Sequence, residues 1–262
     1  MKVALLQMEI KEGNKETNID HALEMIEKAA GVDFIMLPEL WPVGYYYFNG
    51  WINSAEPLNG PIISALKKKA RELNAYIHSG SIVEKRDHKY FNTSVLINQK
   101  GEVIAKYSKS HLFSLNSSEP MLVERGKECS VVDTEFGKIG LAICYDIRFP
   151  EFFRFMTDKG AEIFVICLGW QLMVRLMHYP VMVQSRAIDN QAYVLACNAA
   201  GGPKQTPYFG WSMVVDPTGQ IVAAGKMGEE DVVYAEIDVE VVRRTRKVFP
   251  YIYDSRYRVL ER

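Results

Sequence analysis

The fold is decided by the opening stretch VALLQM (residues 3–8), NIDHALEMIEKAA (residues 18–30) and DFIML (residues 33–37). The first and third segments are short apolar runs between polar residues, a pattern typical of buried strands. The middle segment has the apolar period of a helix that ends before Gly31, and its buried face is predicted to comprise Ala22, Met25, Ile26 and Ala29. Two strands joined by a crossover helix pair in parallel, so this stretch predicts an α/β layered fold.

Strands and helices continue to alternate along the chain. Helices are predicted at 60–73, 150–159 and 179–189, and strands at 76–83, 138–143, 163–167, 193–198 and 232–237. Two pairs of strands around turn-like residues, 92–97 with 103–107 and 213–215 with 221–224, are predicted to form antiparallel hairpins. About a dozen strands and five helices therefore predict two mixed sheets packed face to face, with helices outside.

Length and charge limit the kind of function. A chain of 262 residues is near the upper limit for one hydrophobic core, so we expect residues 1–262 to form a single domain. Lys plus Arg total 31 and Asp plus Glu total 32, so no basic field attracts nucleic acid or an anionic membrane. The first apolar run is too short for a signal peptide or a membrane span. We therefore expect a cytoplasmic protein that acts on a small molecule.

The four cysteines differ in their surroundings, and no CxxC pair indicates zinc binding or disulfide exchange. Cys167 and Cys197 lie inside apolar strands, where a thiol behaves as a small hydrophobic group, and Cys129 lies in a polar loop. Cys144 ends an apolar strand and begins the turn YDIRFPE (145–151) before a helix. This is the context of a nucleophile elbow, where backbone N–H groups at the helix start can also bind an oxyanion.

A nucleophilic Cys144 needs a base or a positive charge nearby, because a thiol with a pKa of ~8.5 is mostly protonated at neutral pH. Among the histidines, His111 and His178 alone lie in loop-like positions near predicted strand ends. Either could serve as the base, and either could instead be a structural histidine.

A carboxylate and a lysine offer a different set of partners. Glu39 follows the apolar strand 33–37 within the largely apolar stretch PELW (38–41), where burial would raise its pKa and allow proton exchange near neutrality. Lys109 also follows a strand end. The structural alternatives are a carboxylate that caps a turn and a solvated surface lysine.

Three ordered blocks resemble the signature blocks of the nitrilase superfamily of carbon–nitrogen hydrolases: PEL (38–40), KSHLF (109–113) and CYDIRFPE (144–151). The resemblance extends over nearly the whole chain, including SRAIDNQ (185–191) and DPTG (216–219). Within the superfamily the chain is most similar to the omega-amidase branch. That branch removes ammonia from the distal amide of 2-oxoglutaramate and related short dicarboxylic monoamides.

The resemblance implies a reaction and the residues that perform it. A small amide would be hydrolysed to ammonia and a carboxylic acid through a thioester on Cys144, with Glu39 as general base and Lys109 as the cation facing the tetrahedral intermediate. A backbone N–H near Tyr145 would share the oxyanion. Glu119 matches a second glutamate that orients lysine and substrate, although a plain loop carboxylate is the alternative. No metal and no cofactor are implied.

The resemblance also implies a four-layer αββα sandwich that usually forms a homodimer. The apolar, aromatic stretch VFPYIY (248–253) is more than a solvated tail needs, so we expect the C-terminal segment, about 245–262, to make the dimer contact.

Two departures from the omega-amidase pattern leave the substrate open. Gly210-Trp211-Ser212 replaces a Gly-His-Ser block, and a loop that contains phenylalanine in that branch is LGWQ (168–171) here. If Arg175 reaches the pocket, its guanidinium would bind a substrate carboxylate. Trp170, Trp211 and the run YYYF that begins at Tyr45 would instead line an apolar pocket for uncharged amides. Tyr145 and His178 are further candidates for substrate contact.

Other functions stay open at this stage. A nitrilase, an aliphatic amidase or an acyltransferase would use the same cysteine chemistry. A hydrolase with a cysteine–histidine pair would use His111 or His178 as its base. A metabolite-binding protein without catalysis is the alternative from another class, and the intact set of Glu39, Lys109 and Cys144 argues against it.

Overall fold

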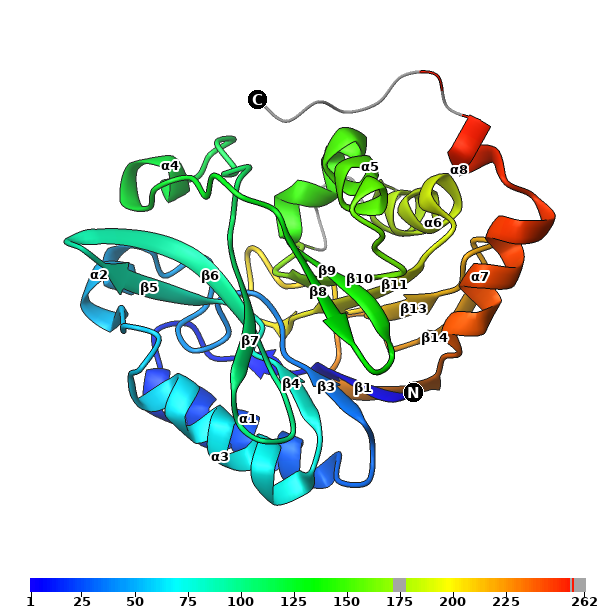
Figure 1. Cartoon of the computed structure of the whole chain (residues 1–262). Coiled ribbons are helices and arrows are strands. Elements are labelled where there is room, and N and C mark those ends of the chain that lie inside the picture. The colour runs from blue at the N-terminus through cyan, green and yellow to red at the C-terminus, as the bar shows by residue number, and fades with distance from the viewer. Residues whose placement is uncertain (172–177, 255, 257–262) are drawn as a thin grey trace.

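The computed structural model describes residues 1–171, 178–254 and 256. Two large mixed sheets pack against each other, and helices cover their outer faces (Figure 1). This arrangement agrees with the predicted α/β fold, a four-layer αββα sandwich. Among the described residues, no helix is long and apolar enough to cross a membrane.

The first sheet has seven strands in the order β15-β1-β3-β4-β6-β5, with β7 also paired to β6. Its strands are β1 (Lys2–Gln7), β3 (Phe34–Met36), β4 (Tyr76–His78), β5 (Ile82–Arg86), β6 (Lys89–Ile97), β7 (Val103–Ser108) and β15 (Asp231–Glu236). β1, β3 and β4 are parallel, as the opening stretch predicts. Side chains of β1 alternate between two cores: Val3 and Leu5 face the second sheet, while Ala4 and Leu6 join the core under the helices.

The second sheet has six strands in the order β14-β13-β11-β10-β9-β8. Its strands are β8 (Ser130–Thr134), β9 (Gly137–Ile143), β10 (Ile163–Leu168), β11 (Tyr193–Asn198), β13 (Met213–Val215) and β14 (Ile221–Ala224). The Cys197 thiol lies between the sheets, where its Sγ is 3.4 Å from the carbonyl oxygens of Leu6 and Met36. A short parallel pair, β2 (Glu9–Ile10) with β12 (Ala200–Gly201), further joins the segments that follow β1 and β11.

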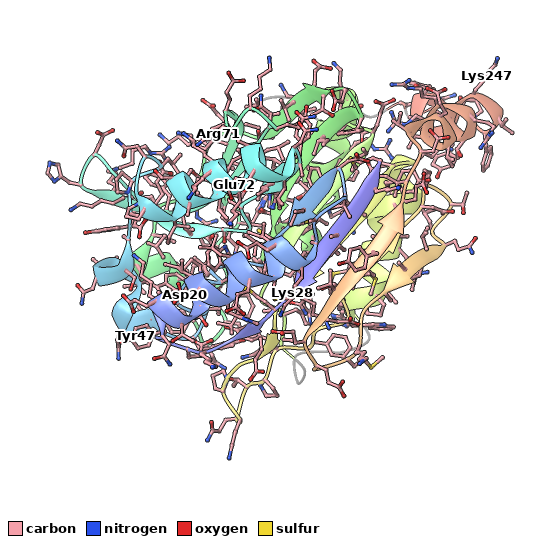
Figure 2. All side chains as sticks on the ribbon, turned by 90° about the horizontal axis from the view of Figure 1, so that it is seen from below. Asp20, Lys28, Tyr47, Arg71, Glu72 and Lys247 are labelled. Atoms are coloured by element: carbon pink, nitrogen blue, oxygen red, sulfur yellow. The ribbon has the colours of Figure 1, made fainter. Side chains whose placement is uncertain are left out.

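Helices complete the outer layers. α1 (Lys15–Lys28) and α3 (Pro61–Leu73) cover the first sheet, and α5 (Pro150–Asp158) and α6 (His178–Asn190) cover the second (Figure 1). Figure 2 shows α1 and α3 from their outer side, and the labelled charged residues on them are Asp20, Lys28, Arg71 and Glu72. The remaining helices are α2 (Trp51–Ser54), α4 (Glu119–Leu122), α7 (Val239–Val248) and α8 (Tyr251–Asp254), with 3₁₀ turns η1 (Phe48–Gly50) and η2 (Cys144–Arg148).

The structure differs from the sequence prediction in several elements. The strand predicted at 76–83 is split into β4 and β5, because the chain turns at Gly80 with φ +63°. A Cβ on Gly80 would lie 2.0 Å from the carbonyl oxygen of Pro38, so this turn packs directly on the segment that carries Glu39. The described residues contain fifteen strands and eight α-helices rather than about a dozen and five.

Candidate active site

Three strand ends bring the predicted functional side chains together. Glu39 follows β3, Lys109 follows β7, and Cys144 follows β9. The backbone N–H of Glu39 donates to the carbonyl oxygen of Leu168, the last residue of β10, at 3.2 Å. The loop after β3 of the first sheet is thereby fastened to the second sheet, and the site lies where the two sheets meet.

Glu39, Lys109 and Glu119 form an ionic cluster with no exposed surface. Lys109 Nζ donates to Glu39 Oε1 at 2.8 Å and to the two oxygens of Glu119 at 2.9 and 3.1 Å. Two carboxylates therefore share one ammonium ion. Buried charges are stable only when paired and hydrogen-bonded in this way, so the lysine is held in one place.

Asn92 joins the same cluster and was not predicted from the sequence. Its Nδ2 donates to Glu39 Oε1 at 2.9 Å and to Glu119 Oε1 at 3.2 Å. The only signal in the sequence is an amide in a largely apolar strand, β6, where the chain has to supply partners for a buried polar group.

Glu119 is oriented by groups other than lysine. Its Oε2 accepts hydrogen bonds from the backbone N–H of Phe113 at 2.7 Å and from the hydroxyl of Tyr45 at 3.2 Å. The Tyr45 oxygen is also 2.9 Å from Ser117 Oγ. These contacts fix the carboxylate, which in turn fixes one side of the Lys109 ammonium.

Cys144 lies at a strained turn between β9 and η2. Its φ is +43°, a region that side chains other than glycine seldom occupy, and the strain is typical of a functional position. The first N–H groups of a helical turn have no partner within it, so they are available near the thiol. The predicted strand–turn–helix context of Cys144 is therefore confirmed.

Asp146 stabilises the turn at Cys144 through hydrogen bonds, and it is a second residue that the sequence prediction missed. Its Oδ2 accepts from the backbone N–H of Ile143 at 2.9 Å and from the Tyr107 hydroxyl at 2.7 Å, and its Oδ1 is 2.7 Å from His111 Nδ1. The His111 ring also stacks on Phe149, with centroids 3.9 Å apart. Its described contacts are thus with Asp146 and aromatic rings, not with Cys144.

Burial and charge set the protonation of the site. Burial raises the pKa of Glu39, an effect that Lys109 opposes. Burial lowers the pKa of Lys109, but the carboxylates of Glu119 and Glu39 outweigh it and hold the pKa well above the ordinary value. Burial, followed by the negative charge of Glu39, raises the pKa of the Cys144 thiol. At rest the site therefore holds a protonated thiol hydrogen-bonded to Glu39, beside a lysine that stays charged.

A narrow pocket opens above the thiol. Cys144 and Gly169 lie in its wall, and the other lining residues are Tyr45, Tyr46, Phe113, Tyr145, Arg148, Trp170 and Gln171. The Gly169 N–H donates to Glu39 Oε2 at 3.1 Å and lies close enough to the Cys144 sulfur to oppose the rise in the pKa of the thiol. Three predicted substrate contacts, Tyr45, Tyr145 and Trp170, thus line the pocket.

Arg148 supplies a guanidinium at this pocket that was not predicted. Its Cζ lies 4.7 Å from the centre of the Trp170 ring and 5.9 Å from that of Tyr145, as cation–π contacts. Its Nη1 is 3.5 Å from His178 Nδ1 and 3.9 Å from the Met182 sulfur. Among the described residues it has no carboxylate partner.

The other predicted pocket residues have different places. Arg175 lies outside the described residues. His178 begins α6 and contacts Arg148, and it does not line the pocket. Trp211 packs against Phe209, with ring centroids 5.6 Å apart, and it is absent from the pocket lining. The described residues contain no cluster of His, Cys, Asp and Glu suited to hold a metal ion.

The fold is a two-sheet α/β sandwich, and its site places a buried carboxylate–ammonium pair beside a cysteine at a strand-to-helix turn. This combination is typical of hydrolases that use a thiol. The family profile described as "Carbon-nitrogen hydrolase" matches residues 2–247, and the chain belongs to this family. The prediction of an enzyme that hydrolyses carbon–nitrogen bonds of small amides is thereby confirmed at the level of the family.

Named relatives support the same conclusion. The chain is 35% identical to 2-oxoglutaramate amidase of Bacillus subtilis over 97% of both chains. It is 32% identical to omega-amidase NIT2 of Homo sapiens, covering 97% of this chain and 95% of that protein. The crystal structure of Saccharomyces cerevisiae Nit3, a member of branch 10 of the nitrilase superfamily, superposes with a TM-score of 0.90 at 31% identity, over 98% and 97% of the two chains. The predicted likeness to the omega-amidase branch of the nitrilase superfamily is confirmed.

Proposed function

We propose that the chain is an omega-amidase-like enzyme in which Cys144 is the nucleophile, Glu39 the proton shuttle and Lys109 the oxyanion partner. The observation that carries this proposal is the buried cluster in which Lys109 bonds Glu39 at 2.8 Å while the Glu39 carboxylate lies close enough to the Cys144 thiol to raise its pKa. A base beside both a fixed cation and a nucleophile at a pocket is the arrangement that acyl transfer requires.

The first half-reaction forms a thioester. Glu39 takes the proton of the Cys144 thiol as the sulfur attacks the amide carbonyl. The raised pKa of both groups favours transfer during attack rather than a resting thiolate. Negative charge then develops on the carbonyl oxygen, where Lys109 and the N–H groups at the start of η2 stabilise it. The acid form of Glu39 protonates the departing amine, and ammonia leaves.

The second half-reaction uses the same carboxylate. Glu39 removes a proton from a water molecule that attacks the thioester carbonyl, the C–S bond breaks, and the proton returns to the Cys144 sulfur. Glu119 keeps the Lys109 ammonium in a fixed position through both steps, because it bonds the ammonium with both oxygens. We assign it a positioning role. This chemistry requires no metal and no cofactor.

We infer that the substrate amide carries an anionic end, in keeping with the names 2-oxoglutaramate amidase and omega-amidase borne by relatives. Arg148 supports this inference, since its guanidinium lies in the pocket wall without a carboxylate partner among the described residues. Its N–H groups are placed to donate to both oxygens of a substrate carboxylate. Arg148 thus takes the role that the sequence suggested for Arg175, and His178 would orient it.

An ammonia-release assay tests the function and the specificity together. Succinamate and 2-oxoglutaramate are compared with butyramide and butyronitrile, and Cys144→Ala serves as the inactive control. We expect Arg148→Ala to lower kcat/KM at least about tenfold for the anionic amides and little for butyramide. Arg154→Ala on α5, outside the pocket lining, is the matched control, and Arg175→Ala separates the two arginines. Equal losses for charged and neutral amides would contradict the anionic pocket.

Neutral amides are the second candidate, favoured by the aromatic rings of Tyr45, Tyr46, Phe113 and Trp170 in the pocket. If butyramide or butyronitrile is turned over faster than succinamate, an aliphatic amidase or nitrilase is the better description. Transfer of the acyl group to hydroxylamine in preference to water would indicate an acyltransferase. Absence of turnover on the whole panel would leave a metabolite-binding protein.

The proposal extends to assembly. We infer that residues 1–262 form a single domain and that two copies pair through the C-terminal segment, about 245–262. Apolar side chains are exposed on α6 and on the segment beside it, including Val181, Ile188, Val248, Phe249 and Tyr253. Gln191 Nε2 bonds the Phe249 carbonyl oxygen at 2.7 Å, so the end of α6 and the segment after α7 are in contact. Light scattering should give a dimer mass that Phe249→Asp reduces; a monomer of the unchanged chain at micromolar concentration would contradict it.

A cytoplasmic location stays a prediction.

A further inference from the structure

Glu12 is a largely buried carboxylate that the reaction above does not use. It lies in the turn between β2 and α1, and its Oε1 accepts a hydrogen bond from the Tyr208 hydroxyl at 2.5 Å. Its Oε2 is buried and has no hydrogen-bond partner of normal geometry. The backbone N–H groups of Tyr46 and Tyr47 nevertheless face the carboxylate closely enough to lower its pKa.

Tyr208 connects Glu12 to the substrate pocket. Its oxygen accepts the backbone N–H of Tyr45 at 2.7 Å, and its ring stacks on Tyr46 with centroids 5.6 Å apart. A bridge pairs Tyr208 with Gln171, and the Tyr46 hydroxyl also bonds Gln171. Tyr45, Tyr46 and Gln171 all line the pocket, whereas Glu12 does not.

Close packing restricts the conformations that the segments around Glu12, Tyr47 and Tyr208 can adopt. A Cβ on Gly44 would lie 2.3 Å from the Glu12 carboxyl carbon, and one on Gly202 would lie 2.6 Å from the Tyr208 ring. A Cβ on Gly13 would lie 3.0 Å from the Tyr47 ring, and Gly13 N donates to the Val43 carbonyl oxygen at 2.8 Å. Figure 2 shows Tyr47 near the Asp20 end of α1, beside this turn.

No cation neutralises Glu12 among the described residues. The titratable groups that face it are the phenols of Tyr46 and Tyr208, and burial raises the pKa of both, so they stay neutral. Lys15 follows Glu12 closely in the sequence, but its ammonium bonds Glu56. Lys204 lies in the segment before Tyr208 and is exposed. Burial raises the pKa of Glu12 to about 7.

We propose that Glu12 is a positioning residue of the substrate pocket, which holds the Tyr45–Tyr46 wall through the Tyr208 hydroxyl and does so better when ionised than when protonated. A carboxylate is a stronger acceptor than a carboxylic acid for the Tyr208 O–H and the facing N–H groups. Protonation would place a donor at or near Oε2, where the structure offers no acceptor. Substrate affinity should therefore fall as the pH drops through about 7.

This inference rests on the proposed function, since it concerns the pocket of that reaction. Glu12→Gln is the test variant, because it keeps the shape and removes the charge, and Glu16→Gln on the exposed start of α1 is the matched control. Kinetics are measured from pH 6 to pH 8.5 on whichever amide of the panel is hydrolysed. We expect Glu12→Gln to raise KM at least about threefold at pH 8, with kcat within about twofold, and to abolish the rise of KM on acidification that the unchanged enzyme shows.

Two further measurements keep failure of this inference separate from failure of the proposed function. Tyr208→Phe should reproduce the KM effect, and combining it with Glu12→Gln should add little, because both act on one hydrogen bond. Hydrogen exchange in peptides covering 42–48 and 202–210 should be faster in Glu12→Gln, with or without any turnover. If exchange and the KM profile of Glu12→Gln match those of Glu16→Gln, Glu12 does not hold the wall. If the unchanged protein hydrolyses no amide, the proposed function fails, and the exchange result alone decides.

Discussion

Glu39, which is fully buried, and Glu12, which is largely buried, are two carboxylates near the pocket that differ in what surrounds them. Glu39 has a cation at 2.8 Å, an amide at 2.9 Å and a backbone N–H at 3.1 Å. Glu12 has a phenol and no cation among the described residues. The comparison indicates that the Lys109 ammonium opposes the effect of burial on the pKa of Glu39, whereas among the described residues no cation does so for Glu12.

Removing the shared cation should have the largest effect. We expect Lys109→Met to lower kcat by at least about 1000-fold, because oxyanion stabilisation is lost and two buried carboxylates lose their partner. Steady-state ammonia release measures the effect, with circular dichroism to verify folding. Lys106→Met, an exposed lysine on the same strand β7, is the control. A folded Lys109→Met enzyme with turnover within tenfold of the original would contradict the assignment.

Neutralising the two glutamates should separate a proton shuttle from a positioning group. Glu39→Gln should cost several orders of magnitude in kcat, since Glu39 is the base that acts on the thiol among the described residues. Glu119→Gln keeps one acceptor for Lys109, so we expect a smaller loss, on the order of 10- to 100-fold. Rates are compared at saturating substrate. Near-original turnover in a folded Glu39→Gln enzyme would eliminate the mechanism, and equal losses in both variants would make Glu119 more than a positioning residue.

Most of the fold was predictable because its signals are local. The apolar period of α1 identified Ala22, Met25 and Ile26, which are buried, and β11, β13 and β14 have the predicted bounds. Elements with mixed composition escaped prediction. α7 is rich in charged residues, and its place is fixed by tertiary contacts: Arg246 is buried and bonds carbonyl oxygens of Ala161, Asn190 and Gln191.

The site was predictable only in part, for a related reason. Glu39, Lys109 and Cys144 stand out because each follows an apolar strand, and their contacts in space agree with the expectation. Asn92 and Asp146 act through long-range hydrogen bonds, to Glu39 at 2.9 Å and to Tyr107 at 2.7 Å, which no local pattern encodes. Arg148 lies within the motif CYDIRFPE (144–151), but its position against Trp170 follows from the packing of η2 beside β10.

Loosening the turn beneath Cys144 should have an intermediate effect. Asp146→Asn keeps the size but replaces one acceptor oxygen by a donor, opposite either His111 or the Ile143 N–H, so we expect kcat to fall about 10- to 100-fold. His111→Ala should cost less than about tenfold, because the described contacts of His111 reach Asp146 and not the thiol. The rate of Cys144 alkylation by iodoacetamide, followed by mass spectrometry, reports on the same turn. A loss in His111→Ala as large as that in Lys109→Met would revive the cysteine–histidine alternative.

The smallest expected effect concerns stability, and it tests the contrast between the two carboxylates most directly. The pKa of Glu12 is raised from 4.5 to about 7 in the folded protein, so between these values the folded state binds more protons than the unfolded state. The contribution of Glu12 to the free energy of unfolding therefore falls as pH rises from about 4.5 to about 7, by up to about 3 kcal/mol, and is constant above.

Glu12→Gln removes this dependence, so it should gain stability relative to the unchanged protein when the pH goes from 5 to 8. Urea unfolding at both pH values, with Glu16→Gln as control, measures the difference. If Glu12→Gln loses substrate affinity yet gains relative stability at pH 8, the ionised Glu12 supports the pocket and destabilises the fold. If the difference in the free energy of unfolding between variant and unchanged protein is the same at both pH values, Glu12 is ionised throughout, like a paired carboxylate.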